Sequence, residues 1–293
     1  MRTLKPAVSR RPVPWYPSAM NRSTDKAGPG RRDRPAKPGP GHPVDLTEIE
    51  IRTALVRSGI PGVDYAVNPY LGCGHGCLYC YASFMTRYSR RHAGARWGTF
   101  VEAKGNIAGV LRSELARKRK RGTVLLSSVC DPYQPAEVRY RLTRRCLEAL
   151  REAGWGFDIL TRSPLVTRDV DLLAPAGGVS VGLTVPTDDD GVRKILEPNA
   201  PPIAGRIAAL KKLHEAAVDT WAFIGPMLPM NPKGLYEALN PFVNRVLIDG
   251  LHYRSKVAGL FERLNWGYAL TDRYALETER ELRRLFGEKA ESV

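Results

Sequence analysis

Three cysteines within eight residues are the feature of this chain with the clearest chemical meaning. Cys73, Cys77 and Cys80 stand in the string Cys-Gly-His-Gly-Cys-Leu-Tyr-Cys, just after a strand-like run that ends at Asn68. Their spacing brings three thiolates to one centre and supplies no fourth. A structural zinc site uses four protein ligands, whereas a site with an open position is suited to chemistry. A cubane iron–sulfur cluster held by these three cysteines would leave one iron free to bind a small molecule.

Two other interpretations of the cysteines are weaker. A zinc site could recruit His75 or Cys130 as its fourth ligand, but zinc motifs usually consist of two separated pairs, and no second pair is present. His75 also lies between two of the cysteines, where it is badly placed to reach a metal that they already hold. A disulfide framework is also unfavoured, because the five cysteines are few for a chain of this length and odd in number.

The cysteine string resembles the signature of the radical S-adenosylmethionine superfamily, Cys-x3-Cys-x-aromatic-Cys, with Tyr79 as the aromatic residue. The longer string from Asn68 to Ala82 resembles a narrower branch, related to the DNA repair enzyme spore photoproduct lyase. Further segments agree in order, namely Asp131–Glu137, Leu160–Asp169, Val179–Thr184 and Leu196–Pro198. The resemblance covers about residues 64–249, so it leaves out the segment before Pro43 and the last part of the chain.

This resemblance implies two cofactors, a [4Fe-4S] cluster and S-adenosyl-L-methionine. The open iron would chelate the amino and carboxylate groups of S-adenosylmethionine. An electron from the cluster would break its carbon–sulfur bond, and the 5′-deoxyadenosyl radical would remove hydrogen from the substrate. The cofactors carry this chemistry, while the protein orients them and excludes water. The electron donor implied is a flavodoxin or a ferredoxin. Glycines 72, 74 and 76 would let the backbone wrap closely around a cluster, although they also suit an ordinary turn.

Beyond the cysteines, predicted strands and helices alternate. The predicted strands are Tyr65–Asn68, Thr123–Val129, Phe157–Leu160, Val179–Val185, Trp221–Ile224 and Arg245–Ile248. Between them, apolar residues recur at helical spacing in three stripes: Ile107, Val110, Leu111 and Leu115; Val138, Leu142, Cys146 and Leu150; and Ile203, Ile207 and Leu210. Alternating units predict an α/β fold with parallel strands and right-handed crossovers. We expect an open partial barrel of six units, as the family uses, although periodicity alone does not fix that number.

In such a barrel the functional residues gather at the carboxyl ends of the strands. Resemblance assigns the following roles there. Tyr79 and Tyr81 border the cluster and the cofactor. Asp131 contacts the methionine moiety, Arg162 stands where relatives often carry lysine and faces the cofactor carboxylate, and Thr184 contacts the ribose. Each could instead be a polar group satisfied within the protein, and Asp131 could be a helix N-cap. Exchanging lysine for arginine keeps the charge but changes the donor geometry.

Cys130 is a candidate catalytic residue. In the lyase, a cysteine near the second strand returns a hydrogen atom to the substrate radical, but its position corresponds to Ser128 here. Strand alternation would put Ser128 and Cys130 on the same side, so the Cys130 thiol could act instead. The alternative is a small apolar filler. Cys146 lies in a helical stripe and is expected in the core.

Composition bears on the partners and the compartment. The chain has a net charge of +15, and no apolar run is long enough to span a membrane. Residues 1–43 are rich in Pro, Gly and Arg and are expected to be a disordered tail, followed by a barrel domain with a helical extension over 44–293. The Arg-rich start lacks the apolar core of a secretory signal. Free cysteines fit a reducing compartment, so we expect a cytoplasmic monomer.

Basic residues suggest a nucleic-acid partner. Arg117–Arg121 close one predicted helix, and five arginines crowd the next, at 139, 141, 144, 145 and 151. Three hypotheses follow: a radical enzyme acting on nucleic acid, the same chemistry on a protein or small molecule, and a non-enzymatic zinc-bearing module that binds nucleic acid. True lyase activity is less favoured, because serine holds the donor position and no lesion-recognition element is evident. The apolar stripes after Arg254 more simply cover the open side of the barrel.

Overall fold

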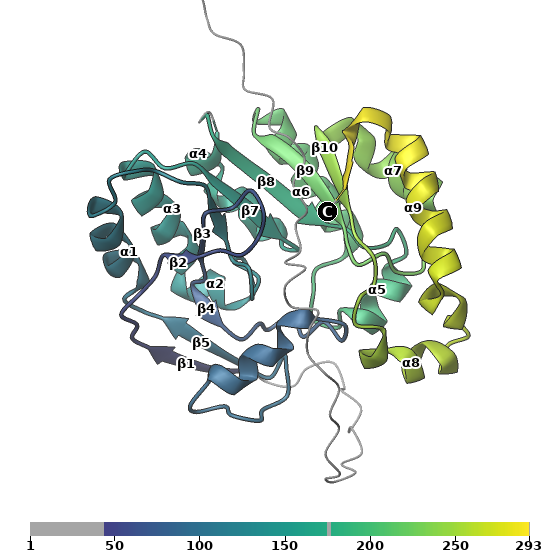
Figure 1. Ribbon diagram of the computed structural model, residues 1–293, viewed down its shortest axis with the longest axis horizontal. Coiled ribbons are helices and arrows are strands. Elements are labelled where there is room, and N and C mark those ends of the chain that lie inside the picture. Colours follow the sequence, from purple (N-terminus) through teal and green to yellow (C-terminus); the bar gives the residue numbers. More distant parts are fainter. Residues whose placement is uncertain (1–43, 175–176, 293) are drawn as a thin grey trace, which may run out of the picture.

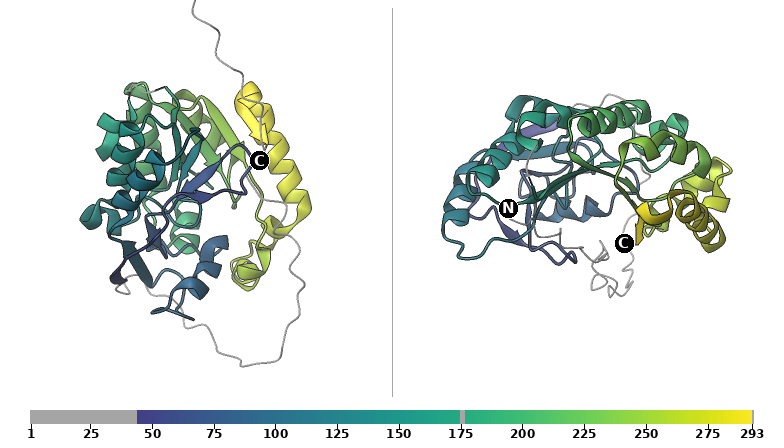
Figure 2. Two further views of the ribbon diagram at one scale, coloured as in Figure 1. Left: turned by 60° about the vertical axis from the view of Figure 1, so that its left-hand side comes forward. Right: turned by 90° about the horizontal axis from the view of Figure 1, so that it is seen from above.

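A mainly parallel β-sheet lies at the centre of the protein, and helices pack along one side of it (Figures 1 and 2). The structure is a computed structural model that describes residues 44–174 and 177–292. In the order β11-β10-β9-β8-β7-β6-β3-β2, the sheet contains β2 (Val56–Arg57), β3 (Tyr65–Val67), β6 (Val124–Leu126), β7 (Phe157–Thr161), β8 (Val179–Thr184), β9 (Asp219–Ile224), β10 (Arg245–Ile248) and β11 (Ala290–Ser292). Edge strands β11 and β2 do not pair with each other, so the sheet is open.

All six predicted strands are present, and they pair in parallel in chain order. Two strands that were not predicted extend the sheet, because β11 pairs in parallel with β10 and β2 pairs antiparallel with β3. The second predicted strand is too long, since it ends at Leu126 and not at Val129. Ser127 has a φ of 66°, in the left-handed region, and this turns the chain out of the sheet.

The helices connect the strands as the alternation predicted. They are α1 (Ile107–Ala116), α2 (Ala136–Tyr140), α3 (Leu142–Glu152), α4 (Val170–Leu173), α5 (Asp190–Leu196), α6 (Ile203–Glu215), α7 (Pro232–Leu239), α8 (Ala258–Arg263) and α9 (Asp272–Phe286). Leu111 and Leu115 of α1, Cys146 and Leu150 of α3, and Leu210 of α6 are buried as expected. Val138 is a wrong core prediction, with 68% of its surface exposed. Arg141 adopts a left-handed conformation between α2 and α3, so Val138 does not continue the stripe of α3.

A second, three-stranded sheet was not predicted. It contains β1 (Asp45–Ile49), β5 (Phe100–Lys104) and β4 (Tyr70–Leu71), with β5 in the middle. Between β4 and β5 the chain carries the cysteine loop and the 3-10 helix η2 (Tyr81–Tyr88). Gly72, with a φ of 87°, touches β5 so closely that an added Cβ would lie 2.4 Å from the carbonyl oxygen of Phe100. The small sheet therefore supports the start of the cysteine loop.

A buried histidine ties the small sheet to the segment after η2. The two ring nitrogens of His92 lie 2.9 Å from Asp45 Oδ2 and 3.0 Å from Glu102 Oε1. The ring stacks on Phe100, with 4.6 Å between the ring centroids. Burial alone would lower the pKa of His92, but hydrogen bonds and charge interactions with both carboxylates raise it above its ordinary value.

Stability should therefore depend on pH through His92. A raised folded-state pKa contributes stability that is complete below the unfolded pKa of 6.5 and is lost as the pH rises through the folded value. We expect His92→Gln to lower the free energy of unfolding by about 1–3 kcal/mol near pH 5.5, and by less near pH 9. Urea denaturation of both proteins at the two pH values measures this difference. Equal losses at both values would contradict a charged His92.

The chain after β10 is mainly helical. It contains η5 (Arg254–Lys256), α8, η6 (Gly267–Leu270), α9 and η7 (Gly287–Lys289), after which β11 joins the sheet. Val257, Phe261 and Leu282 are buried, and α9 packs against α7 and the edge of the sheet. No helix among the described residues is long and apolar enough to cross a membrane. The predicted disordered tail, 1–43, lies outside the described residues, so the division into tail and domain stays a prediction.

Candidate metal centre

The cysteine loop directly follows β4, and all three thiols come from this one loop, between Cys73 and Cys80. Cys73 and Cys77 are buried, and Cys80 is half-buried. Burial raises the pKa of all three thiols, while the nearby Arg162 guanidinium acts in the opposite direction on Cys77 and Cys80. Thiolates at these positions would need further positive charge, which a bound metal provides.

The backbone of the loop is held from two distant segments. Gln134, in the loop after β6, accepts a hydrogen bond from Gly74 N (2.8 Å) and donates one to Gly72 O (3.2 Å). Asn199, just after α5, donates to Gly74 O at 3.0 Å. Gly76, with a φ of 62°, packs against Gly98, where an added Cβ would lie 2.6 Å from Gly76 Cα. Side chains of the right length, and not the cysteines themselves, thus fix the course of the loop.

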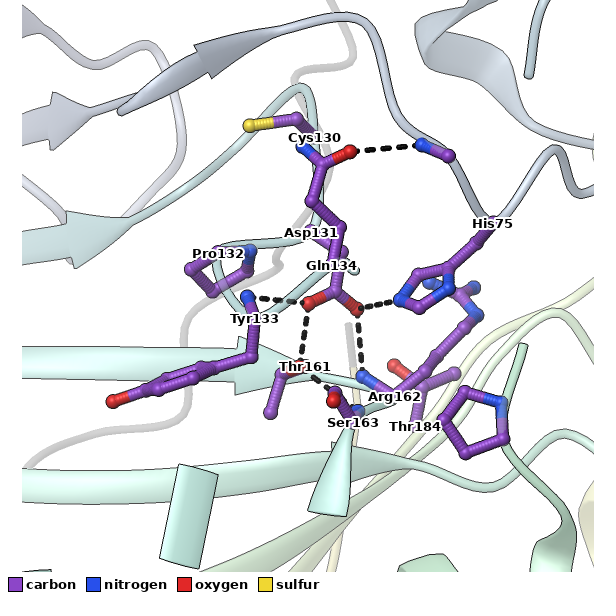
Figure 3. Close-up of polar contacts among 12 residues, drawn as sticks. His75, Cys130, Asp131, Pro132, Tyr133, Gln134, Thr161, Arg162, Ser163 and Thr184 are labelled. Atoms are coloured by element: carbon purple, nitrogen blue, oxygen red, sulfur yellow. Dashed lines mark hydrogen bonds and ion pairs between the residues drawn. The ribbon is translucent and has the colours of Figure 1, made fainter. Parts of the chain in front are cut away.

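Asp131 connects the cysteine loop to the ends of β6 and β7 (Figure 3). One carboxylate oxygen accepts hydrogen bonds from Tyr133 N and Thr161 Oγ1, and the other accepts one from Arg162 N at 2.8 Å and lies 3.4 Å from His75 Nε2. Burial alone would raise the pKa of Asp131, but these partners lower it to about 2. Asp131 is not a helix N-cap, since Pro135 holds that position in α2. Its carboxylate is instead satisfied within the protein, and His75 faces Asp131 as one of its partners.

Arg162 takes part in a buried charge network below the loop. Its Nε donates to Glu197 Oε1 at 2.9 Å, and its guanidinium lies 5.9 Å from the centroid of the Tyr79 ring. Tyr79 donates its hydroxyl to the same Glu197 oxygen, and Arg206 donates to the other. Burial would raise the pKa of Glu197, but Arg206 and Arg162 lower it to about 2. One carboxylate therefore positions both Arg162 and Tyr79 beside the cysteines.

Tyr81 and Cys130 meet at the turn that ends β6. Tyr81 donates its hydroxyl to Ser128 O, and Asn68 Oδ1 accepts from Ser128 N (2.9 Å) and Val129 N (3.0 Å). Cys130 is half-buried, and its thiol lies 3.3 Å from Ser127 Oγ and 3.4 Å from Tyr70 O. Burial raises the pKa of Cys130 to about 11. The alternation argument that placed Ser128 and Cys130 on one side was wrong, because neither residue is in a strand.

Thr184 is the last residue of β8 and is buried. Its carbonyl oxygen accepts a hydrogen bond from Arg206 at 2.9 Å, which links it to the charge network of Glu197 and Arg162. The predicted residues thus converge from separate strand ends.

The basic run Arg117–Arg121 does not join them. It precedes β6, and the adjoining residue Thr123 bonds Asp64 at the start of β3, whereas the cysteine loop lies beyond the end of β3. Arg144 is also engaged, through ion pairs with Glu148, Asp169 and Asp171.

The donor set fits a three-cysteine cluster. The imidazole of His75 faces Asp131 Oδ2 and Asn199 O, Cys146 is enclosed in α3, and the thiol of Cys130 lies against Tyr70 O. Among the described residues, no three His, Cys, Asp or Glu side chains form a group that could hold a metal ion. A cubane makes a different demand, because each cysteine binds a separate iron and the thiols surround the cluster. Cys73, Cys77 and Cys80 would hold such a group and leave one iron without a protein ligand.

Comparison with known proteins decides the family. A sequence model of the radical SAM superfamily matches residues 67–240. The chain belongs to the radical SAM superfamily. Radical SAM proteins use a [4Fe-4S] cluster and S-adenosylmethionine, so both cofactors that the resemblance implied are confirmed at the level of the family.

Two relatives in sequence and one solved structure are also similar to this chain. The chain is 32% identical to an uncharacterized protein of Methanocaldococcus jannaschii over 72% of this chain and 80% of that protein. It is 34% identical to an uncharacterized protein of Mycobacterium tuberculosis over 67% of this chain and 61% of that protein. A spore photoproduct lyase mutant with bound AdoMet and dinucleoside spore photoproduct is similar in structure, with a TM-score of 0.60, 16% identity, and 84% and 81% of the two chains covered. That likeness confirms the α/β fold with a parallel sheet.

Several positioning residues were not predicted from the sequence. Gln134 and Glu197 lie in segments that carry the family resemblance, but nothing in those segments predicted a structural role for either residue. Lys256 lies outside the matched region, and it donates to Cys80 O and, at 2.6 Å, to Ser83 Oγ. The helical extension therefore contacts the cysteine loop, a contact that no local pattern indicates.

Proposed function

We propose that this protein is a radical S-adenosylmethionine enzyme whose [4Fe-4S] cluster is bound by Cys73, Cys77 and Cys80, at the mouth of an open partial barrel whose six predicted parallel strands are extended by β2 and β11. The observation that carries the proposal is the three-thiol loop, with two thiols buried and one half-buried and no fourth metal ligand beside it among the described residues. When bound, the cluster and S-adenosylmethionine supply a 5′-deoxyadenosyl radical, which removes hydrogen from a substrate.

The residues of this chain would bind and orient those groups. Tyr79 lies within the cysteine loop, Arg162 directly follows β7 and Thr184 ends β8, and together they offer a zwitterionic cofactor a ring, a cation and a hydroxyl. Arg162 already pairs with Glu197, so its guanidinium is held in one orientation and offers its remaining N–H groups to a carboxylate. Asp131 has no free carboxylate oxygen, and we assign it to positioning His75 and the loop after β7.

The test is anaerobic reconstitution with iron and sulfide, followed by incubation with a reductant and S-adenosylmethionine. We expect an absorption band at about 400 nm, inorganic sulfide, and release of 5′-deoxyadenosine. Metal analysis that finds one zinc and no sulfide after reconstitution would refute the proposal, and would support the zinc-bearing module instead.

Gln134 offers a sharper test of how the loop is held. Gln134→Ala removes both hydrogen bonds to the backbone on either side of Cys73, and we expect cluster retention during anaerobic dilution to fall about 10–100-fold, as for other supporting residues of metal sites. Gln134→Glu keeps the acceptor for Gly74 N but loses the donor to Gly72 O, so an intermediate loss is expected. Iron and sulfide assays after gel filtration measure both, and unchanged retention in Gln134→Ala would contradict this role.

Nucleic acid is the proposed substrate class, with the lyase-like fold and the net charge of +15 as support. A protein or small-molecule substrate of the same chemistry is the alternative. We propose Cys130 as a hydrogen donor to the substrate radical, because its half-buried thiol stays protonated at neutral pH and lies near Tyr81. A flavodoxin or ferredoxin as electron donor, a cytoplasmic location and a monomeric state complete the proposal.

The first substrate assay uses S-adenosylmethionine labelled at the 5′ carbon with deuterium and DNA that carries thymine photoproducts. Transfer of label between cofactor and DNA supports a nucleic-acid substrate. Release of 5′-deoxyadenosine without transfer, in a fully reconstituted enzyme, would favour the alternative substrate class.

A further inference from the structure

The 3-10 helix η2 carries a line of aromatic side chains away from the cysteine loop. It begins at Tyr81, directly after Cys80, and ends at Tyr88. The ring of Phe84 lies 6.5 Å from that of Tyr81 and 6.3 Å from that of Tyr88, measured between centroids. Tyr81 is half-buried and Tyr88 is 67% exposed. The three rings therefore lead from the metal centre to the protein surface.

Arginines accompany these rings. Arg87, Arg90 and Arg91 are exposed, and no acidic side chain of residues 44–174 or 177–292 forms an ion pair with any of them. Two acids of the small sheet, Asp45 and Glu102, are instead bound to His92. By contrast, arginines elsewhere at the carboxyl ends of the strands, such as Arg144, Arg162 and Arg168, are paired with carboxylates. The segment thus presents uncompensated positive charge beside an exposed aromatic ring.

The location of this segment matters as much as its composition. It is continuous with the cysteine loop, in the blue helical part of Figure 1 beside β4 and β5. The basic run Arg117–Arg121 lies at the opposite end of β3. A nucleic-acid strand bound along η2 would reach the metal centre, whereas a nucleic-acid strand bound only at Arg117–Arg121 would not.

We propose that η2 and the arginines after it form a platform for a single-stranded or locally unpaired nucleic acid, a proposal that rests on the function proposed above. Tyr88 stacks on an unpaired base, and Arg87, Arg90 and Arg91 contact the flanking phosphates. Exposed aromatic rings with cationic neighbours are the combination by which proteins bind such strands, because every base has a face to stack. A duplex keeps its bases stacked on one another and offers only phosphates to this surface.

The test measures fluorescence anisotropy of a labelled oligothymidylate of about twelve nucleotides with the reconstituted protein. We expect Tyr88→Ala to weaken binding about tenfold and Tyr88→Trp to retain it. The matched control is Tyr268→Ala, which removes another exposed tyrosine, 54% exposed and also in an edge-to-face pair, and should bind as wild type.

Salt dependence tests the arginines separately. In the triple variant Arg87→Ala, Arg90→Ala, Arg91→Ala, the slope of log affinity against log salt should fall by about 2, at about 0.7 per phosphate contact. The control triple Arg117→Ala, Arg119→Ala, Lys120→Ala removes the same charge from the opposite end of the sheet and should keep the slope. Equal effects of the two triples, or wild-type binding by Tyr88→Ala, would overturn the platform.

Two further outcomes separate this inference from the proposed function. A wild-type protein that holds its cluster and releases 5′-deoxyadenosine, but binds a poly-glutamate peptide through the three arginines and not the oligonucleotide, would overturn the platform alone. A wild-type protein without a cluster would overturn the proposed function, whatever it binds. Iron and sulfide are therefore assayed on every variant before binding is compared.

Discussion

Replacing Cys77 with alanine should abolish the absorption band at about 400 nm and lower the release of 5′-deoxyadenosine by more than about 100-fold. Cys77 is one of three thiols from one loop, two of them buried and one half-buried, and the His75 ring in that loop is directed at Asp131 and Asn199. The ring nitrogens of His75 lie 3.4 Å from Asp131 Oδ2 and 3.3 Å from Asn199 O, so replacing a lost thiol would require the ring to turn away from both residues. Losing one of three cysteine ligands therefore leaves an iron that the protein cannot hold.

The matched control is Cys146→Ala, which removes a thiol that is also fully buried. Cys146 belongs to the apolar face of α3, packed in the main core. We expect its replacement to leave iron, sulfide and the absorption band unchanged, and to lower the free energy of unfolding by about 1 kcal/mol. A cluster that survives in Cys77→Ala, or that is lost equally in Cys146→Ala, would show that the three-cysteine assignment is wrong.

The parallel strands could be predicted because each is a short apolar run with local boundaries. Val179–Thr184 is buried throughout, as a strand covered on both faces requires. The predicted strand extended past Leu126 because the left-handed turn falls on Ser127. A glycine at that position would have marked the turn, but a serine does not. The same holds for Arg141, whose left-handed conformation separates Val138 from α3.

The small sheet could not be predicted from periodicity. Strand β1 reads Asp-Leu-Thr-Glu-Ile and is mostly exposed, so its pattern is weak. Its partner β5 lies more than fifty residues later, and β5 is defined by that pairing and by the support it gives to Gly72. Long-range pairing of this kind leaves little trace in a local sequence window.

The candidate site divides in the same way. The three cysteines form a local string, so sequence alone could assign them together. The residues that hold their loop are not local: Gln134 bonds to Gly74 and Tyr79 bonds to Glu197 across the fold. Roles for Asp131 and Arg162 came only from the family resemblance. The structure adds that one is fully satisfied within the protein and that the other is oriented by Glu197.

Glu197→Gln should destabilise the protein by about 3–5 kcal/mol, because it leaves the Arg206 guanidinium buried without its counter-charge. Both side chains are fully buried, and within residues 44–174 and 177–292 Arg206 otherwise bonds only to the carbonyl oxygens of Thr184 and Pro201. The lowered pKa of Glu197 also fixes the sign of the acid response. Its stabilisation is complete above the ordinary pKa of 4.5 and is lost as the pH falls from there to about 2. Urea denaturation at pH 7 and at about pH 3 should therefore show a smaller difference between wild type and Glu197→Gln at the lower pH.

Two further variants decide whether charge, and not packing, is the cause. The double variant Glu197→Gln, Arg206→Met removes both charges and should recover part of the stability that Glu197→Gln loses, since the unpaired guanidinium is gone. Glu237→Gln removes an exposed carboxylate that lies 3.9 Å from Lys233, and should change stability by less than about 0.5 kcal/mol. If the double variant is less stable than Glu197→Gln alone, the network stabilises by shape and hydrogen bonding. Arg162 would then be held in place by packing around Tyr79, and the carboxylate would not be what orients it toward the cofactor.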